Sequence, residues 1–327
     1  MREATQLNLA ATVAICTLDR REVLEISLAA LAEQDATGVE WEILVVDNGS
    51  TDGTAQYVES RILTSEIPMR LLVEPQRGLS FARNRAVENA RGEILLFIDD
   101  DFACGPSWLR AHLSAFDDPG VDGTGGRTIP RPRGVVPAWL PQDLDAPELA
   151  GLVARYDFGP DAADVLEGSS SPDIPFGCNM GVRTAIARRL GGFRVDLGWG
   201  RERIPGEETE FFRRVRRHHG RLRYVPDGVG EHHIDVSRLT VARFEQYHYG
   251  VGRSRVRMTP PASRLRALVR FLRECGKALS RTAKARASGR RSLRLRAACA
   301  RYRGQARECL HQARIGPAGR TIVPGES

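Results

Sequence analysis

The chain has 327 residues, of which 42% are hydrophobic, and this is enough for a sizeable core and argues against a wholly disordered chain. No stretch approaches the roughly 18 apolar residues of a membrane span, and the first residues lack the basic segment and apolar run of a signal peptide. The six cysteines are scattered without CxxC pairs, which argues against a zinc ribbon or a disulfide framework and favours the reducing cytoplasm.

The net charge of +7 conceals two regions of opposite sign. Residues 238–327 hold 22 Lys and Arg against 4 Asp and Glu, so this part of the chain carries +18. The rest of the chain holds 26 against 37 and carries −11. We therefore expect an acidic body with a basic extension.

Four short runs rich in Val, Ile and Leu predict buried strands, at residues 11–16, 42–47, 69–74 and 94–99. Helical patterns lie between them: leucines at 24, 28 and 31 share one face, residues 50–52 offer N-caps for a second helix, and 80–89 predicts a third. This alternation predicts an α/β protein with a Rossmann-like, mostly parallel central sheet flanked by helices. Ligands of such sheets bind beyond the carboxyl ends of the strands.

Carboxylates follow three of these predicted strands. The first strand leads into Thr17 and Asp19, the second ends at Asp47, and the fourth ends in three consecutive aspartates at 99–101. In an extended segment the first and third aspartates of the triplet point to one side and the middle one to the other. Two carboxylates on one side suit Mg²⁺ or Mn²⁺ with diphosphate oxygens completing the shell. A solvated acidic turn is the alternative for the triplet, and a turn or helix cap is the alternative for Asp47.

Five motifs occur in a characteristic order: VDNGSTDGT from Val46, EPQRGLSFARNRA from Glu74, the DDD triplet, a segment from Pro175 that contains GCNMG and GGF, and YVPDGVGEHHI from Tyr224. Together they resemble a family 2 glycosyltransferase of the inverting GT-A fold. The resemblance covers about residues 9–250. It implies a catalytic domain over 1–250, with nucleotide-sugar binding at about 9–126 and the acceptor side at about 127–250, followed by a basic amphipathic helical extension over 251–327.

The resemblance also implies which residues bind the nucleotide. Asp47 would accept hydrogen bonds from the nucleobase or ribose, and Thr17 and Asp19 would lie near uracil and ribose. Arg77 and Arg83 would face the base or the phosphates, because a guanidinium offers forked donors for such contacts. An exposed position in an α/β loop is the alternative for both arginines.

In the same family pattern the aspartate triplet corresponds to a DxD motif. Asp99 and Asp100 would lie at the nucleotide sugar, with Asp99 near the ribose and diphosphate, and Asp101 would be the more direct metal ligand. His232 would approach the same divalent metal, Mn²⁺ or Mg²⁺, since a neutral imidazole can join oxygen ligands around such an ion. A solvent-facing histidine is the alternative.

The remaining site residues come from the second half of the resemblance. Gly177 would allow the backbone to approach the donor sugar closely, and Asn179 would bond its hydroxyls. Glu208 is our first candidate for the general base that removes the acceptor proton, and Glu207 is the second. The family usually has Asp where Glu208 stands. The alternative for these glutamates is acidic charge at a helix N-terminus.

Two further segments have less regular patterns. Residues 127–171 are rich in Pro and Gly and predict an irregular insert near the acceptor, in which Trp139 either stacks on the acceptor or anchors the loop to the core. After residue 252 two basic amphipathic helices are predicted, with a break at Ser288-Gly289. Their predicted apolar faces are formed by Leu265, Leu268, Val269, Leu272 and Leu279, and by Leu295, Cys299, Tyr302, Ala306 and Leu310.

Three partners suit these basic helices. They can pack on the acidic body or in an oligomer, lie on an anionic bilayer, or bind nucleic acid. The lack of an RNA-binding aromatic motif beside the arginines disfavours nucleic acid.

We expect a metal-dependent, inverting glycosyltransferase that moves a sugar from a nucleotide-diphosphate sugar, first of all a UDP-sugar, to a saccharide, glycolipid or small-molecule acceptor. The resemblance implies a role in bacterial cell-envelope or polysaccharide biosynthesis, in the cytoplasm or peripherally on the inner face of the membrane. Two alternatives stay open. One is a nucleotidyltransferase, although Thr17-Leu18-Asp19-Arg20 lacks the glycines of a phosphate loop. The other is a non-catalytic scaffold whose basic extension binds a membrane or a partner.

Overall fold

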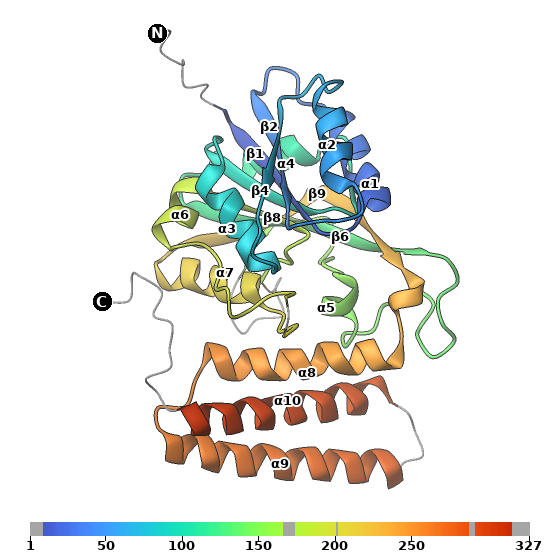
Figure 1. Ribbon diagram of the computed structural model, residues 1–327, viewed down its shortest axis with the longest axis vertical. Helices are drawn as coiled ribbons and strands as arrows, with labels where there is room; N and C mark the ends of the chain where they lie inside the picture. Colours follow the sequence, from blue (N-terminus) through green and yellow to red (C-terminus); the bar gives the residue numbers. More distant parts are fainter. Residues whose placement is uncertain (1–8, 166–173, 201, 288–291, 316–327) are drawn as a thin grey trace. The chain divides into compact units, whose positions relative to one another are not determined.

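Figure 1 shows the computed structural model of the chain, which describes residues 9–165, 174–200, 202–287 and 292–315. Its contacts define two compact units. The first unit holds Met1–Arg133, Val153–Val195 and Glu207–Ile234, and the second holds Gly134–Leu152, Asp196–Gly206 and Asp235–Ser327. The boundary that we predicted at residue 250 falls inside helix α8 (Val241–Met258), so the structure divides the chain differently.

The first unit is built on a sheet with the strand order β3-β2-β1-β4-β8-β6-β9-β5, and β7 pairs with β9 outside this path. The strands are β1 (Ala11–Thr17), β2 (Trp41–Asp47), β3 (Met69–Val73), β4 (Ile94–Asp99), β5 (Phe102–Cys104), β6 (Val121–Arg133), β7 (Ala163–Asp164), β8 (Asn179–Arg183) and β9 (Arg221–Asp235). The helices are α1 (Arg21–Ala32), α2 (Thr54–Ile62), α3 (Leu79–Asn89), α4 (Trp108–Ala115), α6 (Thr184–Arg189) and α7 (Glu207–Arg217).

One half of this sheet is parallel, and it is the half that the sequence predicts. Strands β3, β2, β1 and β4 run in the same direction, with α1, α2 and α3 between them in the chain. The other half consists of antiparallel pairs, β8 with β4 and β6, and β9 with β5 and β7. The α/β fold with helices around a central sheet is confirmed, and its sheet is mixed.

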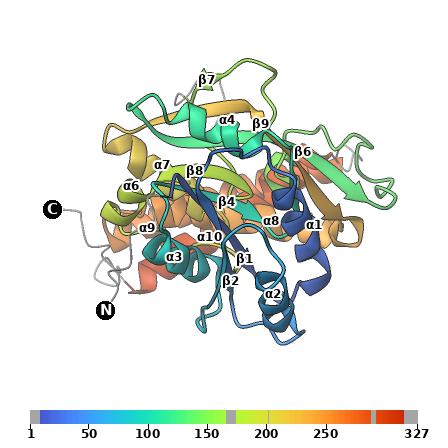
Figure 2. The same ribbon diagram turned by 90° about the horizontal axis from the view of Figure 1, so that it is seen from above.

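Helices cover both faces of the sheet, as Figures 1 and 2 show. Side chains of β1 and β4 alternate between the faces because successive residues of a strand point to opposite sides. Val13 and Leu96 pack with the helices α1, α2 and α4, whereas Ala14 and Phe97 pack with α3, α6 and α7. By this alternation Asp99, two residues after Phe97, continues the face that carries α3 and α7.

Two local predictions need correction. Helix α2 begins at Thr54 after a left-handed Gly53 (φ 86°), and the carboxylate of Asp52 accepts the backbone N–H of Thr54 at 3.0 Å without being the N-cap itself. The expected irregular insert at 127–171 is partly regular, because β6 continues to Arg133 and β7 lies within it. Its last residues and the predicted break at Ser288-Gly289 lie outside the described residues.

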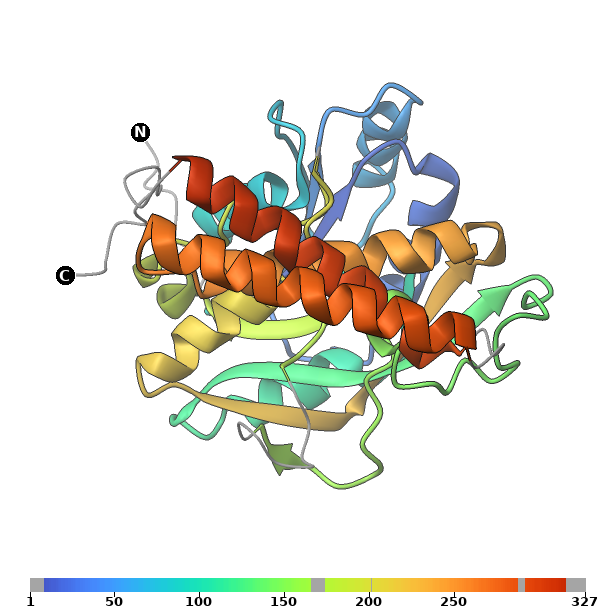
Figure 3. The same ribbon diagram turned by 90° about the horizontal axis from the view of Figure 1, so that it is seen from below.

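The second unit contains the helices α8 (Val241–Met258), α9 (Arg264–Ala287) and α10 (Leu293–Ile315), the short η1 (Val236–Arg238), and most of α5 (Ala150–Val153). Helix α10 contacts both α8 and α9, and Figure 3 shows α9 and α10 running alongside each other. The ring of Trp139 packs edge-on against Phe244 of α8, with centroids 5.8 Å apart. This contact favours the anchoring interpretation of Trp139. None of the described helices is both long and apolar enough to span a bilayer.

Candidate functional site

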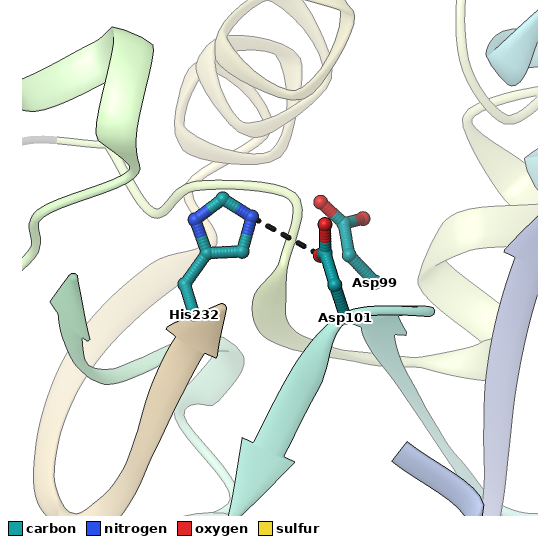
Figure 4. A group of neighbouring side chains, drawn as sticks. All are labelled: Asp99, Asp101 and His232. Atoms are coloured by element: carbon teal, nitrogen blue, oxygen red, sulfur yellow. Dashed lines mark ion pairs between the residues drawn. The ribbon is translucent and has the colours of Figure 1, made fainter. Parts of the chain in front are cut away.

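The carboxyl edge of β4 brings together three side chains that can bind a metal ion, those of Asp99, Asp101 and His232. Asp99 ends β4, and Asp101 follows one residue later, just before β5. Strand β5 pairs with β9 so that Phe102 lies opposite His232, and the backbone N–H of His233 donates to the carbonyl of Asp101 at 2.8 Å. One ligand atom from each of Asp99, Asp101 and His232 lies within 4.8 Å of the other two, as Figure 4 illustrates.

The ring of His232 is held at both nitrogens. Its Nδ1 lies 3.1 Å from the carbonyl oxygen of Val153, to which it donates, and its Nε2 lies 3.2 Å from Oδ1 of Asp101. Burial alone would lower the pKa of His232, but the hydrogen bond and charge of Asp101 outweigh it and raise the pKa to about 9. The Val153 carbonyl thus orients the ring with Nε2 toward the carboxylates, as carbonyl partners do for metal-binding histidines.

The chemistry of this donor set fits a divalent metal ion. Two carboxylates offer hard oxygen ligands, and an imidazole nitrogen is a ligand that Mn²⁺ accepts together with them. The three groups converge on one point although they come from β4, from the turn after it and from β9. We therefore regard Asp99, Asp101 and His232 as the candidate metal-binding group.

Arg20 is a site residue that the sequence analysis missed. Its Nε lies 2.7 Å from Oδ1 of Asp100, and its Nη2 donates to Oδ2 of Asp101. The signal was present in the sequence, since Arg20 follows Thr17-Leu18-Asp19 at the same carboxyl edge. A cation at that position offsets part of the repulsion among the three aspartates.

Thr17 at the end of β1 and Asp100 just after β4 contact each other, and Arg20 contacts Asp100 as well. The hydroxyl of Thr17 donates to Oδ2 of Asp100 at 2.8 Å, and Arg20 contacts the other oxygen. Both residues are buried, and burial raises the pKa of Asp100 to about 7 against the opposing charge of Arg20. Each carboxylate oxygen of Asp100 thus has one partner within the chain, and the contacts of Thr17 and Asp100 with the nucleotide sugar stay predictions.

Arg83 connects the aspartate triplet to the acidic start of α7. Its Nη1 lies 2.8 Å from Oε1 of Glu207, and its Nη2 lies 3.8 Å from Oδ1 of Asp99. The side chains of Arg83 and Glu207 are 4% and 3% exposed, so this ion pair is almost completely shielded from solvent. A Cβ at Gly177 would overlap the guanidinium of Arg83. The missing side chain of Gly177 therefore makes room for Arg83, and its role in admitting the sugar stays a prediction.

Glu208 differs from Glu207 in its environment. It is partly buried, and burial, then the negative charge of Glu207, raises its pKa to about 8. Arg83 opposes this rise because its positive charge favours the carboxylate. The carboxylate of Glu207 is held in an ion pair with Arg83. The raised pKa of Glu208 instead suits a base that exchanges protons near neutral pH.

A second group of predicted residues lies around the loop after β2. Asp47 is buried, and its Oδ1 accepts the backbone N–H of Ser50 at 3.1 Å. Oδ1 of Asp19 accepts the backbone N–H of Thr51 at 2.6 Å. The guanidinium of Arg77 is well exposed and lies 4.0 Å from Oδ2 of Asp19. The structure thus brings Asp19, Asp47 and Arg77 together around one loop.

Asn179 does not fit the role that we expected. Its Oδ1 accepts from Nε1 of Trp108 at 2.8 Å and lies 3.0 Å from Nε2 of His112. Its Nδ2 donates to the carbonyls of Arg127 and Gly228 at 3.2 and 2.9 Å. The side chain is buried and its polar atoms are all bonded to residues of α4, β6 and β9, so the prediction that it bonds sugar hydroxyls is corrected to a structural role.

Comparison with known proteins shows which family the chain is similar to. The sequence profile of glycosyl transferase family 2 matches residues 12–190, which is just over half of the chain. The chain is 35% identical over 109 residues to an uncharacterized glycosyltransferase, YfnE, of Bacillus subtilis. That match spans 33% of this chain and only 27% of YfnE.

Two solved structures share the fold. S. aureus TarS 1-349, in complex with UDP, is 17% identical with a TM-score of 0.55, and the alignment covers 93% of this chain and 92% of that one. The mannosyltransferase PcManGT from Pyrobaculum calidifontis, in complex with GDP-Man and Mn²⁺, is 20% identical with a TM-score of 0.52, with 96% and 77% covered. Both likenesses support the GT-A fold.

Proposed function

This chain belongs to glycosyl transferase family 2, and on that premise we propose that it transfers a sugar from a nucleotide-diphosphate sugar to an acceptor hydroxyl. A UDP-sugar is the first candidate donor, supported by the UDP complex of TarS, and GDP-mannose is the second, supported by the PcManGT complex. The proposed acceptor is a saccharide, a glycolipid or a small molecule, and the proposed outcome is inversion at the anomeric carbon.

One observation supports this proposal above all others: Asp99, Asp101 and His232 converge beside a buried Arg83–Glu207 pair. A bound Mn²⁺ or Mg²⁺ would supply positive charge against the diphosphate that leaves the sugar. Asp99, Asp101 and His232 would hold that ion. Arg83 and Arg20 add positive charge beside the aspartates.

We assign the general base to Glu208. In its ionised form it takes the proton of the acceptor hydroxyl while the acceptor oxygen bonds to the anomeric carbon and the bond to the diphosphate breaks. Glu207 is the weaker candidate, because the 2.8 Å ion pair with Arg83 holds its carboxylate in place. Asp47, Asp19 and Arg77 are the proposed contacts of the nucleoside.

The cytoplasm remains the proposed location. All six cysteines are free thiols, and this supports a reducing compartment. A role in cell-envelope or polysaccharide biosynthesis is also part of the proposal, and it rests on the family resemblance.

The experiment is the release of UDP or GDP from a panel of UDP- and GDP-sugars, measured as slow donor hydrolysis so that no acceptor is needed. We expect release from one donor with Mn²⁺ or Mg²⁺ and none with EDTA. Asp101→Asn should reduce this release by at least a hundredfold. Glu88→Gln is the matched control, because Glu88 is an exposed carboxylate on α3 that touches no site residue, and it should leave the rate unchanged. Equal rates in wild type and Asp101→Asn would contradict the metal assignment.

Glu208 is tested in the same assay with an acceptor. Once an acceptor is found, Glu208→Gln should lose transfer to it while still binding the donor. A Glu208→Gln variant that transfers sugar at the wild-type rate would contradict the base assignment.

A further inference from the structure

The outer face of α9 carries a row of apolar side chains that remain exposed. The fractions are 71% for Leu265, 62% for Leu272 and 71% for Leu279, and Leu268 and Val269 lie in the same row. At 100° per residue these five positions fall within an arc of about 100°. The spacing of these residues in the sequence predicted this apolar face, and among the described residues nothing covers it.

Helix α9 already has its packing partner on another side. Ala267, Glu274 and Ala278 form its buried face. Toward α10, the hydroxyl of Thr282 lies 3.7 Å from the sulfur of Cys299. The leucine row is therefore additional to the face that holds α9 in its helical unit.

The charge of α9 indicates what kind of surface can cover the leucine row. Its described side chains include one acid, Glu274, which is buried and lies 2.9 Å from Lys277 and 3.5 Å from Arg273. Against it stand six basic side chains, Arg264, Arg266, Arg270, Arg273, Lys277 and Arg281. Arg266 and Arg273 are exposed beside the row, at about 80–100° around the helix from Leu265.

A partner for this face must accept apolar side chains and carry negative charge. A second copy of the same face brings like charge against like charge, and nucleic acid offers phosphates but no apolar surface for a leucine row. The surface of an anionic bilayer offers both, since its headgroups attract arginine and its acyl boundary receives leucine.

We propose that the outer face of α9 docks on an anionic lipid bilayer, with the helix lying parallel to the membrane plane. The leucine row enters the headgroup–acyl boundary, and Arg266 and Arg273 contact lipid phosphates. This docking goes beyond the proposed transfer reaction and does not depend on the donor site.

The test is co-sedimentation of the full chain with vesicles of phosphatidylcholine alone, and with phosphatidylglycerol added at a ratio of about three to one. We expect binding to the anionic vesicles at least tenfold stronger than to the neutral ones, and weaker binding as salt rises. The triple variant L265Q/L272Q/L279Q should lose at least tenfold in binding. The variant R266Q/R273Q should lose the preference for anionic vesicles.

The matched control is L63Q/V135Q/V195Q, which replaces three exposed apolar side chains outside α9 and should bind as the wild type does. Circular dichroism checks that each variant is folded, and donor hydrolysis should be unchanged in L265Q/L272Q/L279Q. Equal vesicle binding by wild type and the leucine variant would overturn the proposal. A dimer in light scattering that the leucine variant abolishes, without vesicle binding by the wild type, would also overturn it and would assign the face to self-association.

Discussion

The guanidinium of Arg83 lies between two acidic groups from distant parts of the sequence, Asp99 at the end of β4 and Glu207 at the start of α7. Rings of Phe97 and Phe193 lie 5.9 and 5.5 Å from it and keep water away. A buried charge of this kind is stable only while its partner is present. Arg83 therefore acts as a positioning residue for both carboxylates.

We predict that Arg83→Met lowers the free energy of unfolding by about 3–5 kcal/mol, because Glu207 is left as an unpaired buried charge. The double variant R83M/E207Q should recover most of that loss without recovering donor hydrolysis, since Asp99 still lacks its cation. Urea denaturation measures the stability and the donor assay measures the rate. Arg77→Met is the control, because Arg77 is largely exposed, and its unfolding free energy should change by less than about 0.5 kcal/mol.

Glu208 gives the reaction its expected pH dependence. A base must be ionised to accept a proton, and the pKa of Glu208 is raised to about 8, so transfer should fall as the pH drops below that value. Glu207→Gln removes the neighbouring negative charge and should move the midpoint to lower pH. The measurement is kcat against pH at saturating donor and metal, with Glu88→Gln as the unshifted control. A base with a pKa of about 8 changes its ionisation within the range pH 6 to 9. A rate that stays constant over this range would therefore contradict the assignment.

At the scale of helices and strands, backbone contact decides which positions tolerate a side chain. A Cβ at Gly304 of α10 would overlap the carbonyl of Tyr249 of α8, and one at Gly252 would overlap the carbonyl of Arg301. These two glycines let α8 and α10 approach closely. Gly276 of α9 has no atom within 4 Å of its Cβ position.

We predict opposite effects for two alanine substitutions in this helical unit. Gly304→Ala should destabilise it by about 1–3 kcal/mol through overpacking, whereas Gly276→Ala should stabilise it by about 0.5–1 kcal/mol, because alanine favours a helix. Thermal unfolding followed by circular dichroism measures both changes. A destabilised Gly276→Ala would show that α9 packs more closely than the structure describes.

The elements that the sequence predicts are those determined by local pattern. Strands β1 to β4 and helices α1 to α3 follow from apolar runs and helical spacing. The pairing of β5 with β9 joins residues about 130 positions apart, and no local pattern in the sequence reports it. Asn179 was assigned to the sugar from the resemblance. No local pattern reports its four partners, because they lie on α4, β6 and β9 and become neighbours only in the folded chain.

The site was predicted in part because family motifs mark it. From the resemblance, Asp101 and His232 were assigned to the metal and Asp99 to the ribose and diphosphate beside it, and the structure brings all three together. Arg20 was missed because an arginine after a strand is common and its partners depend on tertiary structure. The apolar row of α9 was predicted from spacing, but spacing cannot tell whether such a row is buried or exposed.

For the molecule as a whole, the charge distribution separates an acidic part of the sequence from a basic one. The first 237 residues carry −11 and contain the motifs that resemble the glycosyltransferase family, while the remaining residues carry +18. An acidic catalytic body needs a cation to hold an anionic donor, because unscreened carboxylates repel a diphosphate. Donor binding by the whole protein should therefore depend on divalent metal.

The most direct measurement is isothermal titration of the full chain with UDP and with GDP, each with Mn²⁺ and with EDTA, for wild type and Asp101→Asn. We predict that one nucleotide binds wild type at least tenfold more tightly with Mn²⁺ than with EDTA, and that Asp101→Asn loses this difference while remaining folded. Binding of equal strength with and without metal, or an undiminished metal effect in Asp101→Asn, would contradict a metal-dependent donor site at Asp99, Asp101 and His232.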